Sequence, residues 1–245
     1  MAMLDLNAVA CKIDKCNADN ETALYWACEK KLANVATLLL RCDGARDTLA
    51  AISSTGYTPL ILACKRGLDD VVMAFLDLDA VACSIDARND DNETALHWAC
   101  MKKLKAVALR LLKCDGAQDT LSVVDKEGDT PLLVACERGL GDVAMAMLDL
   151  DAVACCIDTR NVSSQTALYW ACKKKLKDVA LRLLSCEGVD TLSVIDNEGA
   201  TPLLVACERG LGDVAMAMLD LDAVACCIDT RNVRNQTALY CARRS

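Results

Sequence analysis

Histidine is almost absent from this sequence: His97 is the single one among 245 residues. The sequence therefore offers few candidates for a histidine base in a catalytic set. It offers too few histidines for a zinc site that needs several of them. The motifs GxxxxGK[ST], GxSxG and HExxH, which mark phosphate-binding loops, serine hydrolases and zinc proteases, are also missing. We predict that the chain is not an enzyme and that it takes no cofactor.

Long apolar runs and an excess of basic charge are missing as well. No apolar run approaches the length of about 18 residues that a membrane-spanning helix needs, and Asp5 interrupts the N-terminus too early for a signal peptide. Lys and Arg number 27 against 35 Asp and Glu, and the net charge of −8 argues against nucleic acid as the main partner. These features predict a cytoplasmic, reducing location, without membrane insertion and without nucleic acid.

Aromatic residues make up only 3% of the chain, so its apolar mass is mainly Ala, Leu, Val and Cys. The 17 cysteines are odd in number and recur at a regular spacing, which does not fit a disulfide framework. Zinc sites of this kind need two C-x2-4-C knuckles, and a second one beside Cys11 and Cys16 is missing, so no metal site is predicted. For the adjacent Cys155–Cys156 and Cys226–Cys227, a thiol-metal or redox role stays open beside a structural one. We expect small buried apolar groups at the cysteines that follow an alanine, which are Cys28, Cys64, Cys100, Cys136, Cys172 and Cys207.

The chain repeats itself: residues 130–162 recur without change at residues 201–233. A threonine followed by Ala-Leu or Pro-Leu marks each unit, and the units alternate between two types. We call them TA repeats, such as TALYWACKKKLKDVALRLLSC, and TP repeats, such as TPLLVACERGLGDVAMAMLDL. The marker threonines are 35 or 36 residues apart, at Thr22, Thr58, Thr94, Thr130, Thr166, Thr201 and Thr237. A repeat of this length indicates an architecture built by stacking.

Each repeat predicts two short helices followed by a loop. Thr130 suits a helix cap, Pro131 the first helical position and Gly139 a left-handed helix end. A second helix is expected from about Asp142, with Val143 on its apolar stripe. A loop of roughly 15 residues then leads to the next threonine. Helices this short are not stable alone, so each repeat must bury its apolar face on its neighbours.

The stretch DKEGDTPLLVACERGLGDVAMAMLDL resembles an ankyrin repeat, whose pattern is D-x-x-G-x-T-P-L-H-x-A-A, then a Gly, a Val and a Leu pair. The resemblance recurs six times and implies an all-α fold, an ankyrin-type helix-turn-helix solenoid with hairpin-like loops. The residues that carry it are Asp125, Gly128, Thr130, Pro131, Leu132, Ala135, Gly139, Val143 and Leu148.

We expect a single ankyrin-repeat array over residues 1–245, with six whole repeats that start near residues 17, 53, 89, 125, 161 and 196. Residues 1–14 are expected to hold the second helix only of a partial repeat, and residues 232–245 the first helix only. Neither end carries a polar cap, which solenoids usually need. We therefore interpret the chain as a piece of a longer array or a truncated product; self-association through the uncapped ends stays open, and the oligomeric state is not predicted.

The TA repeats depart from the family pattern at the end of the first helix, where Lys31, Lys103 and Lys175 stand in place of glycine. Each lysine is expected either to take a left-handed conformation or to end the helix differently. His97 occupies the family's histidine position, which implies a structural hydrogen bond beside the turn.

Trp26, Trp98 and Trp170 lie on the predicted first helices. They have two interpretations: a core between repeats, which we favour, or an aromatic stripe that contacts a ligand.

A basic residue stands two positions after the Ala-Cys pair of every first helix: Lys30, Arg66, Lys102, Arg138, Lys174 and Arg209. A cation at a helix C-terminus is favourable by itself, by about 0.3–1 kcal/mol, so a solvated face explains the pattern. In the ankyrin fold, however, these positions face the concave groove. The resemblance therefore also implies a basic line that binds an acidic, extended segment of a partner.

The resemblance implies a scaffold that binds other proteins along the concave face and the turn tips. The alternative is a structural spacer or a non-catalytic repeat segment of a larger membrane, cytoskeletal or enzyme protein. Besides the six basic residues, the expected partner-binding residues are Glu29, Lys65, Met101, Glu137, Lys173, Glu208, Lys126, Glu127, Asn197 and Glu198.

Overall fold

The computed structural model of the chain describes residues 13, 15–42, 44–78, 84–186, 191–221 and 228–243. The chain divides into two compact units, Met1–Val123 and Val124–Ser245, and each is described by itself. Apart from Ile13, the partial repeat expected at residues 1–14 lies outside the described residues, as do Cys226 and Cys227. The expectation of a single array over the whole chain stays a prediction.

The predicted all-α repeat is confirmed, because the described residues form helices joined by turns and contain only one isolated bridge, between Cys16 and Thr22. The helices of the first unit are α2 (Ala23–Glu29), α3 (Ala33–Leu40), α4 (Ala45–Leu49), α5 (Pro59–Arg66), α6 (Asp69–Asp77), α7 (Ala95–Met101), α8 (Lys105–Leu111) and α9 (Ala117–Leu121). Those of the second unit are α10 (Pro131–Arg138), α11 (Gly141–Leu148), the 3-10 helix η3 (Asp151–Cys156), α12 (Ala167–Lys173), α13 (Lys177–Leu184), α14 (Pro202–Glu208), α15 (Gly212–Leu219) and α16 (Ala238–Ala242).

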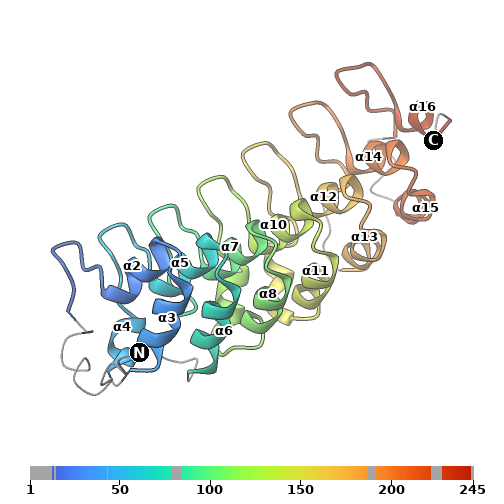
Figure 1. The fold of residues 1–245 in the computed structure, drawn as a ribbon. Helices are drawn as coiled ribbons and strands as arrows, with labels where there is room; N and C mark the ends of the chain where they lie inside the picture. Colours follow the sequence, from blue (N-terminus) through green and yellow to red (C-terminus); the bar gives the residue numbers. More distant parts are fainter. Residues whose placement is uncertain are drawn as a thin grey trace. The chain divides into compact units, whose positions relative to one another are not determined.

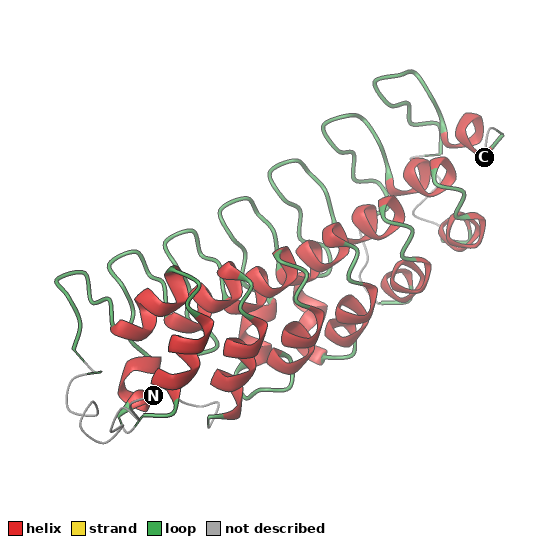
Figure 2. Ribbon diagram, viewed as in Figure 1, coloured by secondary structure: helices red, strands yellow, loops and turns green. Residues whose placement is uncertain are grey.

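Each unit stacks its helices in two layers (Figure 1). In the first unit, the first helices of successive repeats, α2, α5 and α7, pack side by side, and the second helices α3, α6 and α8 form the other layer. The second unit repeats this arrangement, with α10, α12, α14 and α16 in one layer and α11, α13 and α15 in the other. Within each unit the long turns project beyond the first helices (Figure 2). Because the helices have at most nine residues, this lateral packing is what stabilises them.

The first helices begin as the sequence predicts. Each of the seven marker threonines is an N-cap whose side chain accepts a hydrogen bond from the backbone N–H three residues later. Pro59, Pro131 and Pro202 occupy the first helical position of the TP repeats, where no backbone donor is needed. This shared start gives every repeat the same register, so residues at equal distances from the threonine lie at equivalent places.

The ends of the first helices show how the TA repeats replace glycine. Gly67 and Gly139 end their helices in the left-handed region, with φ of 70° and 77°. Lys31, Lys103 and Lys175 take the same conformation, with φ of 57°, 59° and 59°. Of the two alternatives open for these lysines, the structure shows the strained one, in which the chain keeps the family's turn at the expense of backbone strain.

In three repeats the segment after the second helix is more ordered than the plain loop that the sequence predicts. It contains a short helix there, α4, α9 or η3. The helices α4 and α9 each follow a glycine in the left-handed region, Gly44 and Gly116, with φ of 85° and 83°. The prediction of a structureless loop was wrong here, because the helices are five or six residues long and too short to give a periodic pattern.

Two arginines tie neighbouring second helices together. In the first unit Nη2 of Arg110, on α8, donates to the carbonyl oxygen of Leu76 on α6, at 3.1 Å. In the second unit Nη2 of Arg182, on α13, donates to the carbonyl oxygen of Leu148 on α11, at 3.2 Å. Both acceptors lie in the last turn of a helix, where carbonyl groups lack a partner within the helix. These contacts therefore fix the stacking of TA repeats on TP repeats.

The turns that precede the threonines are held by one side chain each. Oδ1 of Asp125 accepts from the backbone N–H groups of Glu127 and Asp129, both at 2.9 Å. The turn closes through Gly128 in the left-handed region, and a Cβ there would lie 2.8 Å from Cα of Asn161 in the next turn. Glycine is thus required both by the conformation and by the neighbouring backbone.

The cysteines of the first helices confirm the prediction of buried apolar groups. Cys28, Cys64, Cys100, Cys136 and Cys172 are buried, and only Cys207 is half-buried. Burial raises the pKa of the Cys28, Cys100 and Cys172 thiols to about 12. Such thiols are not nucleophilic at neutral pH, because the thiolate is the reactive form. Cys156, from the adjacent pair Cys155–Cys156, is also buried, which is the environment of a structural cysteine.

Replacement of a left-handed lysine by glycine is expected to stabilise the chain. Lys103→Gly removes a strain of about 1–2 kcal/mol at the cost of about 0.5–1 kcal/mol of unfolded-state entropy. We expect a net gain of about 0.5–1 kcal/mol in the free energy of unfolding, measured by urea denaturation. The control Lys103→Ala keeps a Cβ and should show no gain. An equal gain in both variants would mean that the lysine side chain, and not the backbone, is responsible.

Asp129 predicts a pH dependence of stability. Burial raises the pKa of this carboxyl from 3.8 to about 6, although Nδ2 of Asn161 donates to Oδ1 at 3.0 Å and opposes the shift. Between about pH 4 and pH 6 the folded state keeps a proton that the unfolded chain has released, so this group lowers stability as the pH rises through that interval. We expect the stability difference between the wild type and Asp129→Asn to change over that interval and to be constant above it. Thermal melts from pH 3 to pH 8 test this, and a difference that does not vary with pH would contradict it.

Candidate partner-binding face

The six predicted basic residues lie at the C-terminal ends of the first helices. Arg66 and Arg138 are the last residues of α5 and α10, and Lys30, Lys102, Lys174 and Arg209 are the C-caps of α2, α7, α12 and α14. Each cation thus meets the partial negative charge of a helix end, which is the physical basis of the solvated-face interpretation. The structure also shows which groups each of these side chains contacts, and these contacts differ from repeat to repeat.

In the first unit, Arg66 forms an ion pair with a carboxylate of the preceding repeat. Nε of Arg66 donates to Oε2 of Glu29 at 3.2 Å, and Nη2 contacts Oε1 of the same carboxylate. This two-point pair joins the ends of α5 and α2. Arg66 and Glu29 were both predicted to contact a partner, but here they satisfy each other.

The lysines of the first unit lie over aromatic rings. Nζ of Lys30 is 5.2 Å from the centre of the Trp26 ring, and Nζ of Lys102 is 5.5 Å from that of Trp98. Lys65 reaches Trp98 from the neighbouring repeat at 4.9 Å. These distances are those of cation–π contacts. Because the ammonium groups stay on the surface, the rings and lysines form a joint basic and aromatic face.

This arrangement corrects the interpretation as core for Trp26, whereas Trp98 and Trp170 are only partly at the surface. Trp26 is 41% exposed, and Trp98 and Trp170 are half-buried. Tyr57, whose ring centre is 4.1 Å from Nζ of Lys65, belongs to the same face and was missed from the sequence. The signal that was present is the spacing of four residues between each tryptophan and the lysine above it, which places them on one side of a helix.

In the second unit, Arg138 and the lysines differ in their partners. Nε of Arg138 lies 3.3 Å from Oε2 of the adjacent Glu137. Nζ of Lys174 is 5.3 Å from the centre of the Trp170 ring. Nζ of Lys173 lies 4.7 Å from that ring and donates to the hydroxyl of Tyr169 at 3.0 Å.

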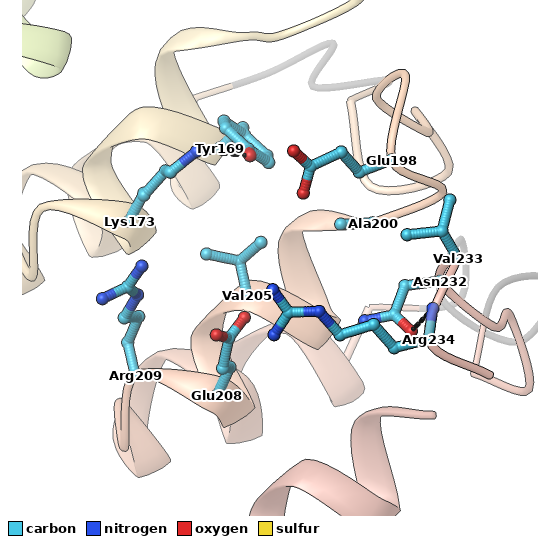
Figure 3. Close-up of a pocket in the computed structure, with 10 residues that line it drawn as sticks. All are labelled: Tyr169, Lys173, Glu198, Ala200, Val205, Glu208, Arg209, Asn232, Val233 and Arg234. Carbon is cyan, nitrogen blue, oxygen red and sulfur yellow. Dashed lines mark hydrogen bonds between the residues drawn. The ribbon is translucent and has the colours of Figure 1, made fainter. Parts of the chain in front are cut away.

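A pocket of about 150 Å³ opens between the ends of α12 and α14 and two turns of the second unit (Figure 3). Four predicted residues line it, Lys173 and Glu198 beside Glu208 and Arg209. The sequence did not indicate the remaining lining residues, Tyr169, Ala200, Val205, Asn232, Val233 and Arg234. Its walls come from two helices and two turns that belong to three repeats, so no single stretch of sequence could show it.

The pocket contains a buried donor without an acceptor. Nε of Arg209 is enclosed and makes no hydrogen bond to the described part of the chain. Beside it, burial raises the pKa of Tyr169 well above its usual range, and a hydrogen bond with the Asp196 carboxylate raises it further. The tyrosine therefore stays a neutral hydroxyl, and Arg209, which lines the pocket, has an Nε donor without an acceptor among the described residues.

The predicted turn-tip residues Lys126, Glu127, Asn197 and Glu198 are all exposed. Their backbones link successive turns within the second unit, since the carbonyl of Glu127 accepts from the N–H of Val162 and that of Glu198 from Val233, both at 2.9 Å. Of the four, only Glu198 lines the pocket. Met101 is half-buried at the end of α7 in the first unit.

His97 has the structural role that the resemblance implied. It is fully buried, and its Nδ1 accepts from the backbone N–H of Thr94 at 3.2 Å in a capping box. Within the described ranges no three metal-ligating side chains lie close enough to hold an ion. No helix in the same ranges is long and apolar enough to cross a membrane.

Solved structures share this architecture. The ankyrin repeat domain of Bcl-3, a unique member of the IkappaB protein family, is 23% identical with a TM-score of 0.59, over 92% of this chain and 95% of that chain; at this identity the likeness shows the fold alone. A chain from the complex of the predatory endopeptidase Bd0816 of Bdellovibrio bacteriovorus with the immunity protein Bd3460 is 28% identical with a TM-score of 0.57, over 84% of this chain and 99% of that chain. No curated protein matches the chain significantly.

A family model describes the repeats directly. The model for ankyrin repeats, in three copies, matches residues 44–122 and 110–194. These stretches together run from residue 44 to residue 194, which is more than half of the 245 residues. With the capped helix pairs and the projecting turns of each unit, this match shows that the chain belongs to the ankyrin repeat family.

Proposed function

We propose that the chain is a protein-interaction scaffold and that each unit binds an acidic, extended segment of a partner across the ends of its first helices and its turn tips. The observation that carries the proposal is the joint face of lysines and aromatic rings on a chain of net charge −8. On a chain that is acidic as a whole, a basic face attracts an acidic partner.

The partners of the side chains indicate which residues are free to bind. Arg66 and Arg138 are paired with carboxylates of the chain itself, so they contribute little to an encounter. Lys30, Lys102 and Lys174 are exposed and contact rings instead of carboxylates. A ring does not neutralise the charge of an ammonium group, so these lysines remain available to a carboxylate while the ring beside them offers apolar contact.

The ankyrin fold supports a binding role, although fold alone does not give function. One of the similar structures is of a complex between an endopeptidase and an immunity protein, which places a chain of similar fold in a protein assembly. We further propose that the two units continue one array of repeats, so that an extended partner contacts several repeats in turn. Modest contacts at each repeat would then add up through multivalency.

A charge-reversal pair tests the first unit. Lys30, Lys65 and Lys102 are changed together to Glu, and a control with Arg41, Lys105 and Lys113 changed to Glu carries the same charge on the second-helix side. The probe is a fluorescein-labelled twelve-residue peptide of alternating Glu and Gly, followed by anisotropy at low and moderate salt. We expect the first variant to bind at least about tenfold more weakly and the control within about twofold of the wild type.

Equal losses in the two variants would show that net charge alone attracts the peptide. The same weak binding in all three proteins would overturn the proposal and leave a structural spacer as the better description. Melting curves establish that each variant is folded.

A further inference from the structure

The two units contain the same junction with different charges. In both, the first helix of a TA repeat packs on that of a TP repeat: α2 on α5 in the first unit and α12 on α14 in the second. The seventh residue after the TA threonine is Glu29 in one junction and Lys173 in the other. The eighth residue after the TP threonine is an arginine in both, Arg66 and Arg209. The junctions therefore form an internal comparison in which one carboxylate has been replaced by a cation.

In the first junction the arginine has its acceptor. The Glu29 carboxylate receives both Nε and Nη2 of Arg66. In the second junction the position of Glu29 is taken by Lys173, and Nε of Arg209 is buried without an acceptor among the described residues. Figure 3 shows the guanidinium of Arg209 pointing from α14 toward the helix that carries Lys173. A buried charged donor of this kind is unfavourable until an acceptor reaches it.

A second substitution opens the space for such an acceptor. The residue before the TP threonine is Tyr57 in the first junction, and its hydroxyl accepts from Lys65. The equivalent residue in the second junction is Ala200, which lines the pocket. The pocket volume of about 150 Å³ is several times the roughly 30 Å³ that a water molecule occupies in the liquid. The end of an acidic side chain fits into this volume.

The charges that face the pocket favour an anion. Lys173, Arg209 and Arg234 line it, against Glu198 and Glu208. Of the two carboxylates, Glu208 is adjacent to Arg209 in the sequence, yet neither bonds to Nε of Arg209. Among the lining residues an incoming carboxylate thus meets three cations against two carboxylates. Glu208, beside Arg209, and Asp196, which bonds to Tyr169, are the competing groups.

We propose that this pocket binds the carboxylate of an acidic side chain from the partner, in the place that Glu29 occupies in the first unit. Arg209 donates from Nε, and Lys173 supplies the second cation. The proposal rests on the proposed function, because it identifies where the acidic segment is anchored and which single group anchors it. The carboxylate at the C-terminus of a peptide has the same chemistry, and the experiment below separates the two sources.

The Nε–H resonance of Arg209 reports on the pocket directly. In a ¹⁵N-labelled full chain it is assigned by its loss in Arg209→Lys. The chain is titrated with N-acetylglutamate α-amide, which carries only a side-chain carboxylate, with N-acetylalanine, which carries only a terminal one, and with N-acetylglutamine α-amide, which carries neither. We expect a saturable shift with the glutamate probe, a smaller one with the alanine probe and none with the glutamine probe. The Nε–H of Arg66, already paired with Glu29, should not move.

Two matched variants test the geometry. Lys173→Glu restores the arrangement of the first unit, so we expect it to pair with Arg209 and to weaken the glutamate probe by about tenfold or more. Lys175→Glu makes the same charge change two residues away, at an exposed position outside the pocket, and should weaken the probe by less than about threefold. Glu208→Gln removes the competing carboxylate and should tighten binding.

Equal shifts of Arg209 with the glutamate and glutamine probes would overturn the proposal, and so would equal losses in Lys173→Glu and Lys175→Glu. A terminal carboxylate that binds more tightly than the side-chain one would overturn the assignment of the source. The test is independent of the proposed function: loss of peptide binding to the lysines of the first unit leaves the Arg209 titration unaffected. Conversely, an unresponsive Arg209 leaves the peptide assay intact.

Discussion

Lateral packing of each first helix between the same helices of neighbouring repeats is the interaction on which the rest of the structure depends. A helix of seven or eight residues has too few internal hydrogen bonds to offset its nucleation cost, so it forms only when its apolar face is covered. In α5, six consecutive residues from Pro59 to Cys64 are buried, because neighbouring helices cover more than one side of it. Ala and Cys at these positions keep the helices close enough for that packing.

The constraint of stacking also fixes where side chains can vary. Every first helix starts at a capping threonine, and in the six repeats from α2 to α14 the seventh and eighth residues after it fall at the helix end. Glu29 and Lys173 occupy equivalent places there, as do Tyr57 and Ala200 at the turn. Because these positions contribute little to the core, the repeats can differ in their surface chemistry while keeping one fold. The ion pair between Arg66 and Glu29 can therefore be present in one junction and have no counterpart in the equivalent one.

Aromatic residues are scarce in this chain, and each of the three tryptophans contacts a lysine, with Trp26 exposed and Trp98 and Trp170 half-buried. A cation over a ring keeps its charge accessible and limits its own movement at the same time. Lysines held in this way lose less conformational entropy on binding than free ones. The face formed in each unit therefore combines attraction for an acidic segment with some preorganisation, which compensates for the lack of large apolar anchors.

Local propensity and the period of the repeat were enough to predict the helix pairs and the threonine caps, and the motif residues of each repeat indicated the family and the buried cysteines. The sequence also identified four of the residues that line the pocket, Lys173 and Glu198 beside Glu208 and Arg209, because repetition makes equivalent positions visible. It could not show that Arg66 is paired and Arg209 is not, that Trp26 is exposed, or that Asn232 and Arg234 close the pocket. Those features depend on distances between side chains of different repeats, and only packing in three dimensions decides which neighbours a side chain meets.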